Sequence, residues 1–297
     1  PALLSLCLFA GARSPTAAAD AVEAALTQDP AADPAYPATM AELTVTSAGA
    51  RLPAHIYVAA GAGPHPTVVF LHGFPGNERN LDLAQALRRF GFNTVFFHYR
   101  GAWGAEGAYS ILGQRDDVAA VIAHLSDAEV AAALRVDTSA FSLLGHSLGG
   151  WLALASGART AELQCVMALA PANLALWQDE LAGSADPRGF AAYADTLFML
   201  RGMSAQSLRD EIAAAPRDAL DTRGFGAQLA GKAVFLAVGE DDAVTPAATD
   251  WAPVAAAYAS VPGVRFTGRL LPGDHSFSTS RLRLTREILS WAGTNCR

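Results

Sequence analysis

Charged side chains are scarce in this chain, and the positive ones are the scarcer kind. Asp, Glu, Lys and Arg make up 16% of the 297 residues, and 28 acidic against 21 basic side chains give a formal net charge of -7. No cluster of Lys and Arg resembles a nucleic-acid footprint, so we expect neither nucleic acids nor anionic membranes as partners. Hydrophobic residues make up 52% of the chain, which excludes an extended disordered protein and suffices for a sizeable core.

Cysteine is also rare, with Cys7, Cys165 and Cys296 as the three examples. None has the CxxC or Cys/His spacing of a zinc site, and we predict no metal. Cys165 lies in the apolar run Leu163 to Leu169, which predicts a buried core thiol. Cys165 and Cys296 allow at most one disulfide, and the sequence leaves their pairing open.

The apolar stretch at the N-terminus is too short to cross a membrane, and it resembles a truncated secretory signal over residues 1–19. The stretch leads to three alanines, 17–19, a small-residue pattern that predicts cleavage before Asp20. A membrane anchor or a mobile N-terminal arm is the alternative interpretation, and the large Leu6 before Cys7 argues against a lipoprotein. We therefore expect an exported protein, periplasmic or secreted, with no stable membrane insertion after cleavage.

The rest of the chain is interpreted as a linker or N-terminal arm (20–39), rich in Ala, Asp and Pro, followed by one domain (40–297). A hairpin over 42–58 precedes an alternation of strand and helix patterns. The strands are expected at 67–71, 93–98, 140–144, 165–169, 233–238 and 264–270, and the helices at 77–90, 116–125, 148–158 and 281–291. This order predicts the α/β class with a doubly wound, mostly parallel sheet. Amphipathic pieces without strands predict a helical lid insertion at about 171–229.

One segment carries a strong chemical signal. Gly145-His146-Ser147-Leu148-Gly149 is a Gly-x-Ser-x-Gly turn between an apolar strand and an apolar helix. Such a sharp turn holds its serine in a strained conformation, and side chains two positions either side of it would collide. The turn raises the Ser147 hydroxyl at a helix N-terminus, where the helix dipole favours developing negative charge. The segment thus predicts a nucleophilic serine.

The chain from about residue 65 to the C-terminus resembles the α/β-hydrolase family, in particular its serine esterases and lipases and its small prolyl-oligopeptidase-like members. His72-Gly73-Phe74-Pro75-Gly76 follows a predicted strand where that family places its oxyanion-hole loop. The resemblance implies that the backbone N–H groups of Phe74 and Leu148 bind the oxyanion. It implies a serine mechanism without a cofactor.

A serine nucleophile needs a base that is itself oriented, and the family's chain order is serine, acid, histidine. His275 is the one histidine after Ser147. The family pattern Gly-x-x-Asp-x-Val-x-Pro matches the chain from Gly239 to Pro246 and implies Asp242 as the acid, with Asp241 as the alternative. The histidines before Ser147 are interpreted as surface or structural residues.

The segment from Tyr99 to Ser110 is similar to the YRGxxGSxG loop of small prolyl-oligopeptidase-like hydrolases, with Ala105 in place of the serine. Trp103 and Tyr109 of this loop are candidates for lining the substrate cleft, and a packed loop without substrate contact is the alternative.

The expected activity is that of a serine hydrolase acting on a carboxylic ester through an acyl-enzyme. The same triad cleaves amides and peptides, so an aminopeptidase or acyl-peptidase is the second hypothesis. A non-catalytic binding protein on a hydrolase scaffold is the third. The expected partner is a small ester or short peptide, and the sequence does not indicate an oligomeric state.

Overall fold

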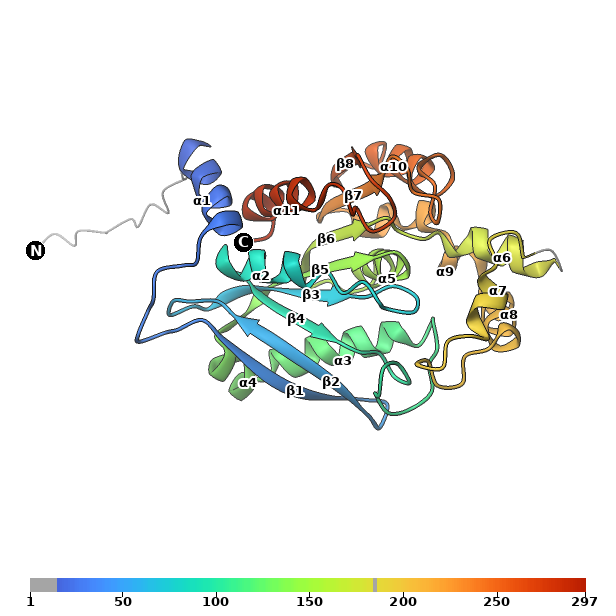
Figure 1. Cartoon of the computed structure of the whole chain (residues 1–297), viewed down its shortest axis with the longest axis horizontal. Coiled ribbons are helices and arrows are strands. Elements are labelled where there is room, and N and C mark those ends of the chain that lie inside the picture. Colours follow the sequence, from blue (N-terminus) through green and yellow to red (C-terminus); the bar gives the residue numbers. More distant parts are fainter. Residues whose placement is uncertain (1–14, 184–185) are drawn as a thin grey trace, which may run out of the picture.

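One eight-stranded sheet lies at the centre of the computed structural model, which describes residues 15–183 and 186–297 (Figure 1). Its strand order is β1-β2-β4-β3-β5-β6-β7-β8. β1 and β2 pair antiparallel, as do β2 and β4, and the other neighbours are parallel. The strands are β1 (Thr39–Ser47), β2 (Ala50–Val58), β3 (His65–Leu71), β4 (Asn93–Phe97), β5 (Val136–His146), β6 (Leu163–Leu169), β7 (Ala233–Gly239) and β8 (Arg265–Leu271). The predicted doubly wound, mostly parallel sheet is confirmed.

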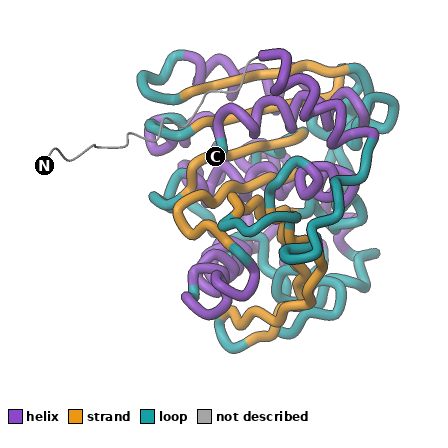
Figure 2. Tube along the Cα trace, turned by 90° about the vertical axis from the view of Figure 1, so that its left-hand side faces the viewer, coloured by secondary structure: helices purple, strands orange, loops and turns teal. Residues whose placement is uncertain are grey.

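Side chains of the central strands are buried on both faces of the sheet. In β3, Val69 and Leu71 join one hydrophobic cluster, while Val68 and Phe70 join the other, as the period of two in a strand requires. Helices α3 (Gln114–Ser126), α5 (Leu148–Gly157) and α10 (Ala252–Ala259) contribute to the first cluster, and α1 (Pro15–Thr27), α2 (Leu81–Arg89) and α11 (Arg281–Asn295) contribute to the second. Figure 2 shows the strands stacked through the molecule with helices around them.

The helices agree with the predicted ones except that α1, α4 (Ala128–Leu134) and α10 were not predicted. A π-helix, Ala247–Trp251, precedes α10, and two short 3-10 helices, Thr222–Phe225 and Ala227–Leu229, lie between β6 and β7. No described helix is long and apolar enough to span a bilayer.

The chain between β6 and β7 forms a helical insertion, in the segment for which the sequence predicted a lid; its role as a lid stays a prediction. It contains α6 (Leu174–Ala182), α7 (Phe190–Ala194), α8 (Ala205–Ala214) and α9 (Arg217–Leu220), which Figure 1 shows beyond the carboxyl ends of the parallel strands. The insertion is docked on the loop after β4. Glu211 of α8 accepts hydrogen bonds from the Ser110 hydroxyl and from the backbone N–H groups of Ile111 and Leu112.

Helix α1 lies where the sequence predicted the end of a signal and the start of a linker. The predicted cleavage point before Asp20 falls inside this helix. Val22 and Ala25 are buried, and Glu23 forms an ion pair with Arg286 of α11. The chain from 28 to 38 contains neither helix nor strand. Most of the predicted signal, residues 1–14, lies outside the described residues.

Cys165 of β6 forms a disulfide with Cys296, directly after α11. The prediction of a core thiol is therefore wrong in one respect, because Cys165 is buried but oxidised. The bridge joins residues 131 apart in sequence and fixes the C-terminal helix to the sheet.

Reduction of this disulfide is expected to lower the free energy of unfolding by about 2–4 kcal/mol, because it releases a long loop in the unfolded chain. Urea unfolding with and without reductant measures the change, and Cys296→Ser should reproduce the reduced curve without reductant. Coinciding unfolding midpoints of the oxidised and reduced protein, with thiol titration confirming reduction, would contradict the expectation.

Candidate active site

Ser147 lies at the sharp turn between β5 and α5. Its backbone has φ 59° and ψ -120°, which is a strained conformation for a residue with a side chain. A Cβ atom on Gly145 would overlap the Gly149 carbonyl, and one on Gly149 would overlap the Leu71 carbonyl. No other residue fits at positions 145 and 149 without moving the backbone. This is the steric role that the motif predicts for its glycines.

His275 and Asp242 meet at the carboxyl edge of the same sheet. His275 Nδ1 lies 2.8 Å from Asp242 Oδ2, and the Asp242 side chain is almost completely buried, whereas Asp241 is exposed. Burial by itself raises the pKa of the Asp242 carboxyl. The hydrogen bond and charge of His275 and the donors of Thr245 outweigh burial and hold this pKa below its ordinary value. Asp242 is therefore ionised at neutral pH and accepts a hydrogen bond from His275 Nδ1–H.

The loop after β7 surrounds Asp242 with donors. The backbone N–H groups of Val244 and Thr245 donate to Oδ1 at 2.8 and 2.9 Å, and the Thr245 hydroxyl donates to Oδ2 at 2.8 Å. The same hydroxyl oxygen lies 3.3 Å from His275 Nδ1. Sequence analysis missed Thr245, although it occupies a variable position inside the pattern that indicated Asp242.

His146, the residue before Ser147, fixes the loop that carries His275. Its Nε2–H donates to the His275 carbonyl oxygen at 2.8 Å, and the two rings lie 4.7 Å apart. Burial lowers the pKa of His146 to about 3, so the ring is neutral at pH 7. His146 therefore has a structural role, because it holds the backbone of the loop that carries His275.

Ser147 and His275 line the same pocket. Among the described residues no hydrogen bond joins the Ser147 hydroxyl to the imidazole. Hydrogen bonds of this type are often long in a protein without substrate and tighten when the substrate binds.

The two segments expected to supply the oxyanion-hole amides both lie next to Ser147. Leu148 is the first residue of α5, so its N–H has no acceptor within the helix. The loop that carries Phe74 passes close to the nucleophile, because a Cβ atom on Gly73 would lie 2.9 Å from Ser147 Cβ. A side chain at position 73 would collide with Ser147, so the close approach of this loop to the nucleophile requires glycine there.

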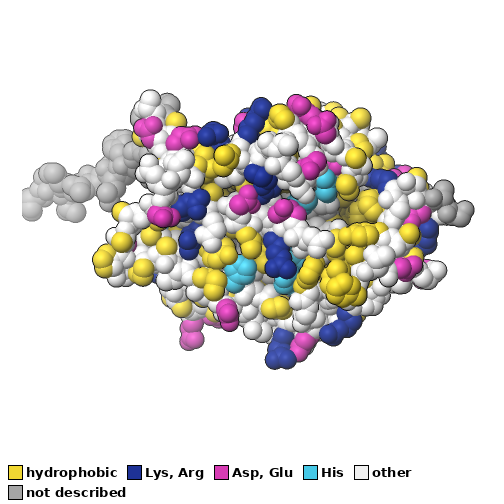
Figure 3. All heavy atoms as spheres, in the orientation of Figure 1, with side chains coloured by type: hydrophobic (Ala, Val, Ile, Leu, Met, Phe, Trp, Pro, Cys, Tyr) yellow, Lys and Arg dark blue, Asp and Glu magenta, His cyan; other side chains and the backbone are white. Residues whose placement is uncertain are grey.

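Two pockets meet at Ser147, His275, Phe74 and Tyr193. The larger, about 470 Å³, is walled mainly by aromatic and aliphatic side chains, and the insertion supplies Trp177, Pro187, Arg188, Phe190 and Tyr193. The smaller, about 180 Å³, includes the polar residues Asn77, Glu78 and Ser276. In Figure 3 hydrophobic side chains gather beside a histidine where the insertion meets the sheet. Sequence analysis found none of the residues from the insertion.

Trp103 and Tyr109 are not among the described residues that line either pocket. Trp103 donates its indole N–H to the Pro75 carbonyl at 2.8 Å, and the Tyr109 ring lies 6.2 Å from that of Phe74. Both therefore contact the loop that carries Phe74. No group of three or more His, Cys, Asp or Glu side chains within the described ranges is placed to hold a metal ion.

Buried histidines near the site should make the protein sensitive to acid. Burial lowers the pKa of His72 and of His146 to about 3, whereas a histidine in the unfolded chain has a pKa of about 6.5. Between these values the unfolded chain binds protons that the folded chain does not, so stability falls as the pH decreases. We expect each of the two to contribute about 1 kcal/mol per pH unit between pH 6 and pH 4.

Urea unfolding across this pH range tests the expectation. His72→Gln should flatten the dependence of unfolding free energy on pH, whatever it does to the stability at pH 7. Parallel curves for the variant and the wild type would contradict it.

The fold and this constellation define a hydrolase of the α/β class, and comparison with known proteins agrees. Residues 68–288 match the model of the alpha/beta hydrolase family, and the chain belongs to this family. A comparison with curated proteins found no match.

Solved structures similar to the chain include an esterase, a puromycin hydrolase and the protein Est1E. The Pyrococcus furiosus esterase Pf2001 is 17% identical with a TM-score of 0.64, and the match covers 88% of this chain and 94% of that one. Est1E from Butyrivibrio proteoclasticus is 17% identical with a TM-score of 0.63, covering 84% and 96%. A puromycin hydrolase is 23% identical with a TM-score of 0.62, covering 89% of this chain and 40% of that one. At these identities the likeness concerns the fold.

Proposed function

We propose that the chain is a serine hydrolase that cleaves carboxylic esters, with Ser147 as nucleophile, His275 as general base and Asp242 as the orienting acid. The observation that carries the proposal is the hydrogen bond of His275 Nδ1 to the buried Asp242 carboxylate, beside a pocket that Ser147 also lines. Because Nδ1 is bound to the acid, the other ring nitrogen, Nε2, points away from it. Nε2 is the nitrogen that must be free to accept the serine proton.

The reaction follows from these roles. His275 takes the proton of the Ser147 hydroxyl as its oxygen attacks the ester carbonyl, and Asp242 stabilises the imidazolium that forms. The backbone N–H groups of Phe74 and Leu148 stabilise the oxyanion of the tetrahedral intermediate. Collapse expels the alcohol, which takes the proton from His275. Water then attacks the acyl-enzyme by the same route and releases the acid.

The larger pocket favours an uncharged, apolar substrate group over an aminoacyl group. An aminopeptidase must bind an α-ammonium, yet no carboxylate is among the described residues that line this pocket, and Arg188, which does line it, is a cation. Its charge is offset by Glu180 and Asp250, so it offers no free charge to a substrate anion either. The similarity in fold to the esterase Pf2001 supports the same choice.

Turnover of a panel of p-nitrophenyl esters against aminoacyl-p-nitroanilides tests the proposal. We expect hydrolysis of the esters, with Ser147→Ala inactive on all of them. Selective turnover of the anilides would favour an aminopeptidase. A folded protein that turns over neither class and is not modified by a fluorophosphonate would favour a non-catalytic binding protein.

We also infer that the protein is exported. The Cys165–Cys296 disulfide supports this, because such bonds persist in oxidising compartments. Fractionation of the native host should find the protein outside the cytoplasm, and a cytoplasmic protein with both thiols free would contradict the inference.

A further inference from the structure

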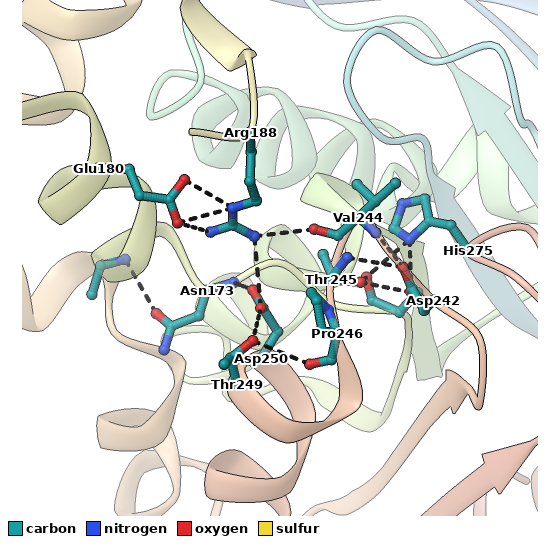
Figure 4. A network of polar contacts seen from close by, with 12 residues as sticks. Asn173, Glu180, Arg188, Asp242, Val244, Thr245, Pro246, Thr249, Asp250 and His275 are labelled. Carbon is teal, nitrogen blue, oxygen red and sulfur yellow. Dashed lines mark hydrogen bonds and ion pairs between the residues drawn. The ribbon is translucent and has the colours of Figure 1, made fainter. Parts of the chain in front are cut away.

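Arg188 of the insertion contacts the loop that carries Asp242. Its Nη1 donates to the Val244 carbonyl oxygen at 3.0 Å (Figure 4). The insertion therefore does more than line the pocket, because one of its side chains binds the backbone two residues after the proposed triad acid.

The guanidinium of Arg188 is held from several sides. Glu180 of α6 accepts from Nε at 2.9 and 2.8 Å, and Asp250 Oδ2 lies 3.6 Å from Nη1. The guanidinium also lies over the Phe190 ring, 5.0 Å from its centre. The Arg188 side chain is 19% exposed, so most of it is shielded from water. Figure 4 shows it between the insertion and the Asp242 loop.

The carbonyl that accepts from Arg188 belongs to the peptide group that also carries the Thr245 N–H. This N–H donates to Asp242 Oδ1 at 2.9 Å, and Asp242 Oδ2 accepts from His275. A charged donor on a peptide carbonyl polarises that peptide and strengthens the hydrogen bond made by its N–H. A continuous chain of hydrogen bonds thus runs from Arg188 through one peptide group and Asp242 to His275.

We propose that Arg188 is a positioning residue that holds the Asp242 loop in its catalytic geometry, so that the packing of the insertion sets the orientation of His275. This proposal rests on the proposed function for its kinetic consequence. Its structural consequence concerns the hydrogen bond between Asp242 and His275 and does not depend on which substrate is cleaved.

Arg188→Gln is the variant that tests the proposal, and Arg217→Gln is its matched control. Arg217 belongs to the insertion too and pairs with Asp179 at 2.6 and 2.8 Å, and within the described part of the chain neither residue forms a hydrogen bond or ion pair with the Asp242 loop. With p-nitrophenyl acetate, whose acyl group is too small to fill the aromatic pocket, we expect Arg188→Gln to lower kcat about 10- to 100-fold and to change KM less than about threefold. The control should keep the wild-type kcat within about twofold.

Two further variants separate positioning from folding. Arg188→Lys keeps the charge but lacks a planar fork that can serve Glu180 and the Val244 carbonyl together, so it should restore only part of kcat. Glu180→Gln leaves Arg188 in place with a weaker partner and should lower kcat in the same direction by a smaller factor. It provides the test if Arg188→Gln does not fold.

A spectroscopic measurement works without turnover. The downfield proton resonance of His275 Nδ1–H reports its bond to Asp242, and it should shift or broaden in Arg188→Gln but not in Arg217→Gln. An unchanged resonance and kcat in folded Arg188→Gln, or a rise in KM confined to bulky esters, would overturn the positioning role. A wild-type protein that cleaves no ester would instead refute the proposed function, and the resonance would still decide the role of Arg188.

Discussion

Asp242→Asn is expected to lower kcat by about 10⁴-fold, whereas Asp241→Asn should leave it within about twofold of the wild type. The two carboxylates are adjacent in sequence, but Asp242 is buried against His275 and Asp241 is exposed. An asparagine at 242 can offer an N–H to His275 Nδ1, which favours the tautomer that places the proton on Nε2 and removes the base. Initial rates with p-nitrophenyl acetate measure both variants.

Asp241→Asn is a close control. The backbone N–H of Asp241 donates to the Gly273 carbonyl at 2.9 Å, and a side-chain substitution keeps this backbone bond. Circular dichroism should show both variants folded. Equal losses in the two variants would mean that the wrong acid has been assigned.

Ser147→Ala removes the nucleophile and is expected to lower kcat by about 10⁵-fold or more, because the remaining site can bind and polarise the ester but cannot form an acyl-enzyme. Ser276 lines the smaller pocket together with Ser147 and supplies the control. Ser276→Ala should keep kcat within about threefold. Comparable losses in the two variants, or full activity in Ser147→Ala, would contradict the assigned nucleophile.

Local sequence patterns predicted the parts of the site that depend on one short segment. The turn around Ser147 has its own steric signature, and the strand that leads to Asp242 is a continuous apolar run followed by a recognisable loop. The sheet was predictable for the same reason, since strands buried on both faces have few polar residues. In each case the residues that make the pattern lie within about ten positions of one another.

Contacts between distant segments were not predictable in this way. Arg188 meets Val244 only because the insertion folds back over the sheet, and no periodicity near either residue indicates that contact. The Cys165–Cys296 bridge joins residues 131 apart. Helix α1 was missed because its alanines and small residues resemble a cleavage region as much as a helix. The aromatic lining of the larger pocket was missed because its residues come from separate segments: Phe74 from a loop, Trp177 from α6, and Phe190 and Tyr193 from α7.

Covalent modification by a fluorophosphonate, followed by peptide mass spectrometry, tests the central claim most directly. The reagent reacts with a serine whose hydroxyl is activated by a neighbouring base. We predict one adduct per chain on the peptide that contains Ser147, and its loss in His275→Gln. An adduct on another serine, or none on a folded protein that hydrolyses esters, would contradict the account.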